Sequence, residues 1–230
     1  SNVLPRLGYR NGIELSDPDT RADYNLPETS LLPSRTDSLG LTKANIAGGA
    51  DWIDFHATVS TAADQTVLAP GQRTRRGTED GRRHAEFRSI APMLDFYTFV
   101  SARYDSIRTR WEAPDGDSVD VSVRYHPKHD YNVDRLMDGA TAALDYYTEN
   151  FGPYQNEYLR IAEFPRYHGG FAQSFLGTVP FSESAGFIAR IETEDHVDYP
   201  FNIAAHEVAH QWWGHQVVGA RVEGATMLSE

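Results

Sequence analysis

Cysteine is absent from the 230-residue sequence, which excludes thiolate zinc sites, disulfide bridges and a cysteine nucleophile. Long hydrophobic runs are also absent: no stretch approaches the roughly 20 apolar residues of a membrane span, and no signal peptide opens the chain. Positive charge is scarce, with 21 Lys and Arg against 33 Asp and Glu and a formal net charge of −12. This balance argues against nucleic acid or an anionic membrane surface as the main partner.

The composition is that of a soluble globular protein. Apolar residues make up 40% and aromatic residues 12% of the chain, enough for the cores of one large or two modest domains. The start Ser1-Asn2 resembles a vector scar, and the sequence stops at Glu230 within a helical pattern. We therefore expect an excised piece of a longer protein.

One short stretch near the end of the chain indicates a chemistry. At about 100° per residue on a helix, His206 and His210 lie one turn apart on the same face, so both imidazoles can reach a single metal ion. Glu207 lies beside that metal, where a carboxylate can take a proton from zinc-bound water and pass it to a leaving amine. The site needs a third protein ligand, and Glu230 offers one.

Two other interpretations of this stretch compete with a catalytic zinc site. Two His and a Glu can occur by chance on a helix that only packs a core, but the flanking residues are apolar, and burying these polar groups there without partners is costly. A closed structural zinc site would need His215, which lies about 140° round the helix from His210. Three ligands and an open position favour catalysis.

The first 125 residues predict a β domain. Residues 1–50 are rich in Pro, Gly, Asp and Ser and indicate an extended, loop-dominated segment, in which Asp17, Asp19 and Asp23 are expected to be solvated charges and not a calcium loop. Alternating apolar and polar residues then predict antiparallel strands. These strands fall near residues 53–59, 85–87, 95–104 and 119–125.

A basic run lies within this β domain. An exposed hairpin tip is favoured over an anion site, because no aromatic residues interleave with the arginines and the chain is acidic. The run comprises Arg73, Arg75, Arg76, Arg82 and Arg83.

Residues 126–230 predict helices and strands in alternation. A helix with one apolar stripe follows Asn132, a candidate N-cap, and stops at Gly152-Pro153. A short strand at 158–162 and a glycine-containing loop precede the metal helix, which Asp198 is expected to cap. The predicted fold class is α+β, with an antiparallel β domain over residues 1–125 followed by a second domain over residues 126–230.

The stretch from His206 to Gly214 resembles the zinc helix of the aminopeptidase N family of gluzincin metallopeptidases. The resemblance implies a saddle-like or sandwich-like β domain and the front half of a thermolysin-like catalytic domain, with a helical C-terminal domain missing. It also implies that His206, His210 and a later glutamate bind zinc, and that Glu207 activates water. The family's usual spacing falls on Ser229, so a one-residue insertion would make Glu230 the ligand; Glu223 is the competitor.

A second family motif is altered in this sequence. The family's G-x-M-E-N loop binds the free amino terminus of the peptide through its glutamate, and the matching stretch here is 169–174, where we align the neutral Gln173. Gln173 contributes no counter-charge to an α-amine, and Glu163 or Glu183 could substitute. The backbone of Gly169 and Gly170 could still pair with an extended peptide substrate.

Residues 159–174 and 227–230 look most like a bacterial subgroup in which this region is fused to the permease subunit of an ABC transporter. This implies a membrane-embedded parent protein with the present part outside the cytoplasm. Two functions follow: a zinc aminopeptidase, or a non-catalytic domain that binds peptides or couples to transport. An intact Glu207 favours the peptidase, and we expect the chain alone to bind zinc weakly and to have negligible activity.

Overall fold

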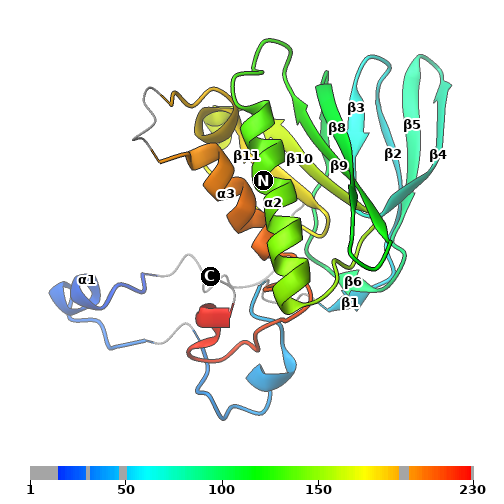
Figure 1. Cartoon of the computed structure of the whole chain (residues 1–230). Coiled ribbons are helices and arrows are strands. Elements are labelled where there is room, and N and C mark those ends of the chain that lie inside the picture. The colour runs from blue at the N-terminus through cyan, green and yellow to red at the C-terminus, as the bar shows by residue number, and fades with distance from the viewer. Residues whose placement is uncertain (1–14, 30–31, 47–50, 192–196, 229–230) are drawn as a thin grey trace.

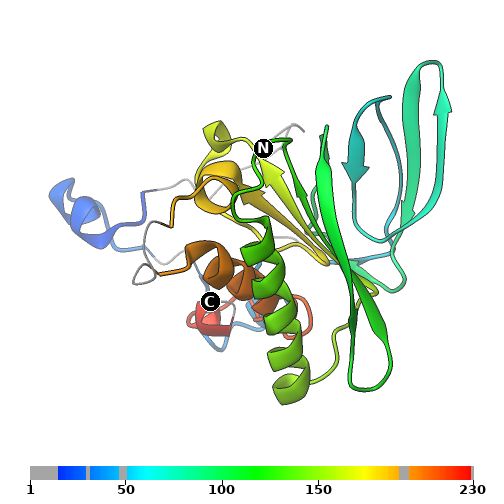
Figure 2. The same cartoon turned by 45° about the horizontal axis from the view of Figure 1, so that its top comes forward.

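A four-stranded sheet lies at the centre of the computed structural model, which describes residues 15–29, 32–46, 51–191 and 197–228. The strand order is β11-β10-β9-β8, with two helices on one face and the N-terminal strands beyond the other (Figure 1, Figure 2). The strands β8 and β9 form an antiparallel hairpin, whereas β9, β10 and β11 run parallel. Their bounds are β8 Asp105–Glu112, β9 Ser118–Tyr125, β10 Tyr158–Phe164 and β11 Thr178–Ser182.

Period-2 alternation gives this sheet one apolar face. The side chains on that face are buried and form one core cluster with residues of the helices. Burial of each large apolar side chain contributes about 1.5–3 kcal/mol, so this face fixes which side of the sheet the helices cover. The strand residues of the cluster are Trp111, Val119, Val121, Val123, Leu159, Ile161, Val179 and Phe181.

The two helices that cover this face are α2 (Val133–Phe151) and α3 (Tyr199–Ala209). They pack against each other at Gly139, where an added Cβ would lie only 2.5 Å from the carbonyl oxygen of Phe201. The helix α3 begins at Asp198, whose side chain accepts a hydrogen bond from the Phe201 N–H at 3.1 Å, as predicted. The predicted extent of α2 is also confirmed.

The predicted capping role of Asn132 is wrong. Asn132 does precede α2, but its side chain makes no capping hydrogen bond. Its amide nitrogen instead donates to the carbonyl oxygens of Gly186 and Ala189 at 2.9 and 2.7 Å. The side chain therefore ties the start of α2 to the end of η4 (Glu183–Phe187), a single π-helical turn that follows β11.

The N-terminal strands form smaller sheets beside the central one. The largest has the order β2-β5-β4, and its β4–β5 hairpin turns through Asp80 and Gly81, both with positive φ. The 95–104 region holds only one short strand, β7, where a longer one was predicted. The bounds are β1 Trp52–Ile53, β2 His56–Ala62, β3 Thr66–Leu68, β4 Gln72–Glu79, β5 Arg82–Arg88, β6 Met93–Leu94 and β7 Val100–Ala102.

The boundary predicted at residue 125 falls inside hydrogen-bonded structure. The strands β8 and β9 precede it, yet β9 pairs with β10 on its other side and contributes to the core under the helices. The division into two domains at this residue stays a prediction.

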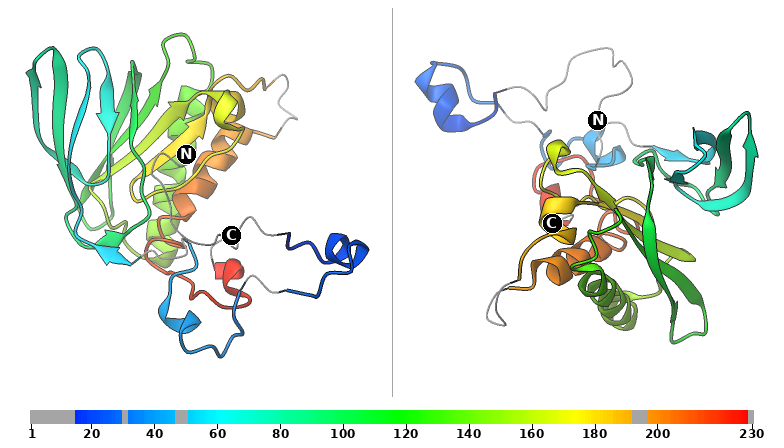
Figure 3. Two further views of the ribbon diagram at one scale, coloured as in Figure 1. Left: turned by 180° about the vertical axis from the view of Figure 1, so that it is seen from behind. Right: turned by 90° about the horizontal axis from the view of Figure 1, so that it is seen from above.

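The N-terminal segment includes two short helices, α1 (Pro18–Asp23) and η2 (Gly40–Thr42). Asp17 caps α1 by accepting from the Thr20 N–H at 2.8 Å, a role that the sequence did not predict. Residues 40–45 run beside residues 219–222, and the Arg221 N–H donates to the Lys43 carbonyl at 2.8 Å (Figure 3). Two further short turns are η3 (Arg166–His168) and η5 (Ala225–Leu228). Within the described ranges, no helix combines the length and apolar character needed to cross a bilayer.

Candidate metal centre

The helix α3 brings His206, Glu207 and His210 together near its C-terminal end. One ligand atom from each residue lies within 4.8 Å of the others, and the Nε2 atoms of the two imidazoles are 3.1 Å apart. Two nitrogen ligands of one tetrahedral zinc, each at about 2.05 Å, lie about 3.3 Å apart, so the imidazole pair fits that geometry. The convergence is the one that helical spacing predicts, and the metal-binding role itself stays a prediction.

The backbone fixes the orientation and tautomer of His210. Its Nδ1 lies 3.1 Å from the carbonyl oxygen of Trp213, which can only accept a hydrogen bond. The Nδ1 atom therefore carries the hydrogen in the neutral ring, and the Nε2 lone pair faces His206. Metal-binding histidines commonly have this arrangement of one nitrogen held by a carbonyl and the other used as ligand.

The three side chains differ in exposure. His206 is exposed, His210 is half-buried and Glu207 is buried, with 7% of its surface exposed. A carboxylate in such a place is shielded from bulk water, which strengthens its electrostatic interactions with nearby charges. The arrangement suits a cation bound at the protein surface, with solvent on one side and the Glu207 carboxylate on the other.

Gln211 was not singled out in the sequence, yet it connects α3 to the glycine-containing loop. It is fully buried, and its Oε1 accepts from the Gly177 N–H at 2.8 Å. Its Nε2 donates to the Ser174 Oγ at 2.6 Å and to the Phe175 carbonyl at 3.0 Å. Ser174 Oγ donates in turn to the carbonyl oxygen of Glu207 at 2.8 Å, so the loop is fastened to the metal helix at the proposed base.

The loop continues the sheet beyond β11. The Gln173 N–H donates to the Pro180 carbonyl at 3.1 Å, and the Phe171 carbonyl accepts from the Ser182 N–H at 2.9 Å. In such an antiparallel pair alternate residues direct their backbone groups to opposite sides, so those of Ala172 point away from β11. The backbone groups that face away from the sheet are thus those of Ala172, whereas the sequence predicted that the backbone of Gly169 and Gly170 could pair with a peptide.

Neither a family model nor a curated protein matches the sequence. Solved structures do match. The crystal structure of a two-domain M1 zinc metallopeptidase mutant bound to L-arginine aligns with a TM-score of 0.61 and 18% identity, over 80% of this chain and 39% of that chain. An M1 zinc metallopeptidase mutant from Deinococcus radiodurans aligns with a TM-score of 0.62 and the same identity and coverage.

The chain shares the fold of the part of these M1 zinc metallopeptidase structures that it covers. This confirms the predicted α+β fold class. The chain spans 39% of the length of each of these two structures.

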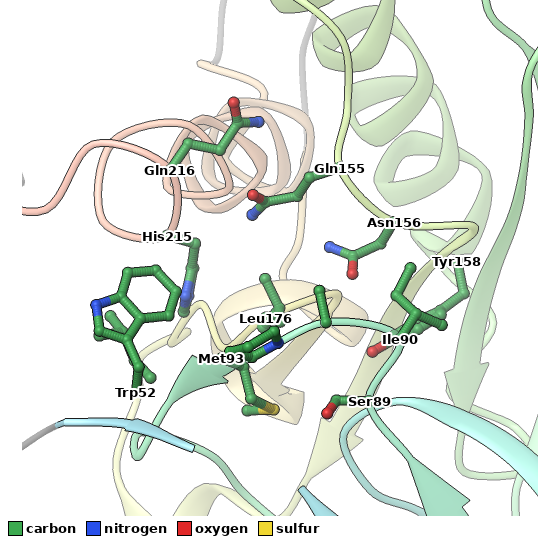
Figure 4. A pocket seen from close by; sticks show the side chains of 13 residues that line it. Trp52, Ser89, Ile90, Met93, Gln155, Asn156, Tyr158, Leu176, His215 and Gln216 are labelled. Carbon is green, nitrogen blue, oxygen red and sulfur yellow. The ribbon is translucent and has the colours of Figure 1, made fainter. Parts of the chain in front are cut away.

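Within the part of the chain that the structure describes, two other residues named as possible zinc ligands, Glu223 and His215, are not grouped with the two histidines. Glu223 is exposed and belongs to no described group of converging ligand atoms. Glu230 and Ser229 lie outside the described residues. His215 is buried and lines a separate cavity of about 330 Å³ between the metal-helix end and the N-terminal strands (Figure 4). Burial lowers the pKa of His215 to about 4, so this imidazole is neutral near pH 7.

The carboxylates named as substitutes for the family's amine-binding glutamate have partners of their own. Glu163 is buried, and its two oxygens lie 2.5 Å from the His126 backbone nitrogen and 2.5 Å from the His129 Nδ1. Glu183 accepts from the Arg166 N–H at 3.0 Å, and its other oxygen is 3.9 Å from the His129 Nδ1. His129, which no sequence pattern singled out, therefore forms a second group with these two glutamates. Gln173 is exposed.

Proposed function

We propose that the chain is the part of a zinc-dependent peptidase, of aminopeptidase type, that supplies the metal helix and the catalytic base. The observation that carries the proposal is the 3.1 Å approach of the His206 and His210 Nε2 atoms with the buried Glu207 carboxylate beside them. His206 and His210 would hold zinc, and Glu230 is proposed as the third ligand. The M1-type fold supports the assignment.

Zinc, when bound, supplies a Lewis acid that polarises a peptide carbonyl and brings the pKa of water towards neutrality. Glu207 accepts the proton from the attacking water and delivers it to the leaving amine nitrogen. The backbone of Glu207 is held by the Ser174 hydroxyl, which donates to the Glu207 backbone carbonyl, and Gln211 donates in turn to that hydroxyl. Burial of Glu207 keeps the carboxylate in place for both proton transfers.

The peptide substrate would lie along the open backbone edge at Ala172. That edge neighbours Ser174, whose hydroxyl contacts the metal helix, so an extended peptide there would place a carbonyl near the imidazoles. The backbone of Gly169 and Gly170 could also pair with the peptide, and Gln173 would accept a hydrogen bond from the α-amine without neutralising it.

The test measures zinc content and peptide turnover separately. Both are measured on the protein extended through the remaining length of the M1 structures, because the chain alone is expected to bind zinc weakly. Glu207→Gln should retain zinc and lose about 10²- to 10⁴-fold in turnover, whereas His210→Ala should lose the zinc. His56→Ala, which removes an exposed imidazole from β2, is the matched control and should change neither. Zinc-loaded protein that cleaves no member of a peptide library would refute the peptidase.

A second function is favoured by one observation. Gln173 is neutral, and Glu163 and Glu183 are engaged with His126, His129 and Arg166, so an ammonium group meets no available carboxylate among them. This supports a non-catalytic domain that binds peptides or couples to a membrane transporter, with the domain outside the cytoplasm. Peptide binding that survives Glu207→Gln, with no cleavage by the unmutated protein, would favour this function over the first.

A further inference from the structure

The face of the central sheet opposite the helices carries a row of arginines. The register places Arg108 of β8 and Arg160 of β10 on either side of Ser122 of β9. Because side chains two apart share a face, Arg124 lies on the same face as Ser122. The neighbours Val121 and Val123 point the other way, into the core under the helices.

These arginines line a cavity between the central sheet and the N-terminal strands. Arg73 of β4 reaches into it from the opposite wall, and the apolar floor includes Val67 and Phe87. The cavity has a volume of about 290 Å³. We call it the arginine groove and define it by Arg73, Arg108, Ser122, Arg124 and Arg160.

The positive charges of the arginine groove are not neutralised by the described part of the chain. None of its four arginines forms an ion pair there, although Arg75 pairs with Glu86 and Arg103 with Asp64 nearby. Asp120 is the one acidic side chain lining the groove in the described residues. It is exposed and lies opposite Arg110 in the sheet register. Four unpaired guanidinium groups in one cavity are unusual in a chain with a net charge of −12.

Arg124 is the arginine of the groove that burial and the neighbouring positive charges destabilise most clearly. Its Nε is buried and has no hydrogen-bond partner. Burial, followed by the charges of Arg108, Arg160 and Arg73, lowers the pKa of Arg124 to about 10, so the group is still charged near pH 7. A buried donor and repelling charges both raise the free energy of the folded chain unless an anion satisfies them.

Arg160 is held in place without being neutralised. Its guanidinium donates to the carbonyl oxygens of Ala69 and Gly71 at 3.0 and 3.1 Å and lies 3.8 Å from the ring centroid of Tyr158. Carbonyl and ring contacts orient the group but leave its full positive charge in the groove. This is pre-organisation of a binding group, which lowers the entropic cost of taking up a ligand.

We propose that the arginine groove binds a small, multiply charged oxyanion of the phosphate class, either free phosphate or a phosphomonoester. Planar guanidinium groups donate in pairs to phosphate oxygens, and the buried Ser122 hydroxyl adds a neutral donor. The cavity volume suits a small ion with a short attached group and not a polymer. The groove lies across the sheet from α3, so this site does not depend on the proposed peptidase chemistry.

Calorimetric titration of the chain with inorganic phosphate tests the proposal, at matched ionic strength against sodium chloride. We expect one phosphate per chain and a thermal midpoint that rises with phosphate but not with chloride. Arg124→Gln should weaken phosphate binding about tenfold, the change expected for one charge-assisted hydrogen bond. A titration with an alkyl phosphomonoester distinguishes the two ligand sources, since tighter binding than phosphate assigns the groove to the ester.

The controls separate a built site from general electrostatics. Arg75→Gln removes an exposed arginine of the same hairpin, paired with Glu86, and should leave phosphate affinity unchanged. Should Arg124→Gln fail to fold, Arg108→Gln on the exposed rim takes its place with the same expectation. The proposal is overturned if phosphate binds no better than acetate, or if Arg75→Gln weakens binding as much as the groove variants do.

Discussion

The two faces of the central sheet carry opposite chemistry. On the helix face, a single helix presents two imidazoles and a carboxylate, donors that attract a cation. On the other face, three strands of the sheet present guanidinium groups without carboxylate partners, and Arg73 of the facing strand β4 adds a fourth; together they attract an anion. The sheet between them is filled by apolar side chains such as Val121 and Ile161, so each face can bind its own ligand. Hydrogen bonds between α3 and the glycine-containing loop hold the first site together, whereas the second site gathers charges that repel one another.

The largest expected effect comes from the hydrogen bonds that fasten the glycine-containing loop to α3. Gln211→Leu keeps the side-chain volume but leaves the buried Gly177 N–H without its partner. It also removes one hydrogen bond each from the Ser174 hydroxyl and the Phe175 carbonyl, which keep their bonds to Glu207 and Thr178. We expect a loss of about 3–5 kcal/mol in the free energy of unfolding, measured by urea denaturation. Gln216→Leu, an exposed neighbour, should change it by less than about 0.5 kcal/mol. Equal losses in Gln211→Leu and Gln216→Leu would show that the hydrogen bonds of Gln211 to the loop do not stabilise the fold.

The next largest expected effect is a loss of stability of the folded chain at acid pH, caused by His215. The folded pKa of His215 is about 4, below its ordinary value of 6.5, so the unfolded chain binds more protons between these values. Stability is therefore complete above about pH 6.5 and falls by about 3 kcal/mol as the pH drops to about 4. Denaturation curves across this range should lose most of that slope in His215→Gln. An unchanged slope would assign the acid sensitivity to other groups.

A smaller loss in the free energy of unfolding is expected when the close contact between α2 and α3 at Gly139 is disturbed. In Gly139→Ala the new Cβ would press on the Phe201 carbonyl oxygen, a backbone atom that cannot turn aside. Overpacking should outweigh the gain in helix propensity and cost about 1–2 kcal/mol. The exposed neighbour Asp138→Ala serves as the control in the same denaturation series, and a stabilised Gly139→Ala protein would contradict the tight α2–α3 contact.

The sequence predicted the helix-face site because that site is local. The spacing of His206 and His210 on one helix sets their convergence, and the Asp198 side chain caps that helix by accepting from the Phe201 N–H three residues on, so neither feature depends on distant contacts. Asn132 failed as a cap because its amide is taken by the carbonyls of residues 186–189, which lie far along the chain.

The arginine groove could not be predicted in the same way. The conspicuous run of arginines forms the exposed β4–β5 hairpin, as expected, and contributes only Arg73 to the groove. The other three arginines come from β8, β9 and β10, and they share a face only because of the strand order and register. The group of His129, Glu163 and Glu183 is equally non-local. Pairing between strands distant in sequence is set by the assembled core, which no local pattern encodes.

The smallest expected effect has the opposite sign and separates the two faces most clearly. Arg108→Gln removes one of the repelling charges, so in phosphate-free buffer of low ionic strength the free energy of unfolding should rise by roughly a few tenths of a kcal/mol. The gain should vanish at about 1 M salt, where the Debye length falls to about 3 Å and the groove charges are screened. Arg110→Gln, whose side chain has Glu112 as a partner at 3.3 Å, should give no gain under either condition. If Arg108→Gln destabilises the phosphate-free chain, the groove arginines act as structural supports and the contrast between the faces fails.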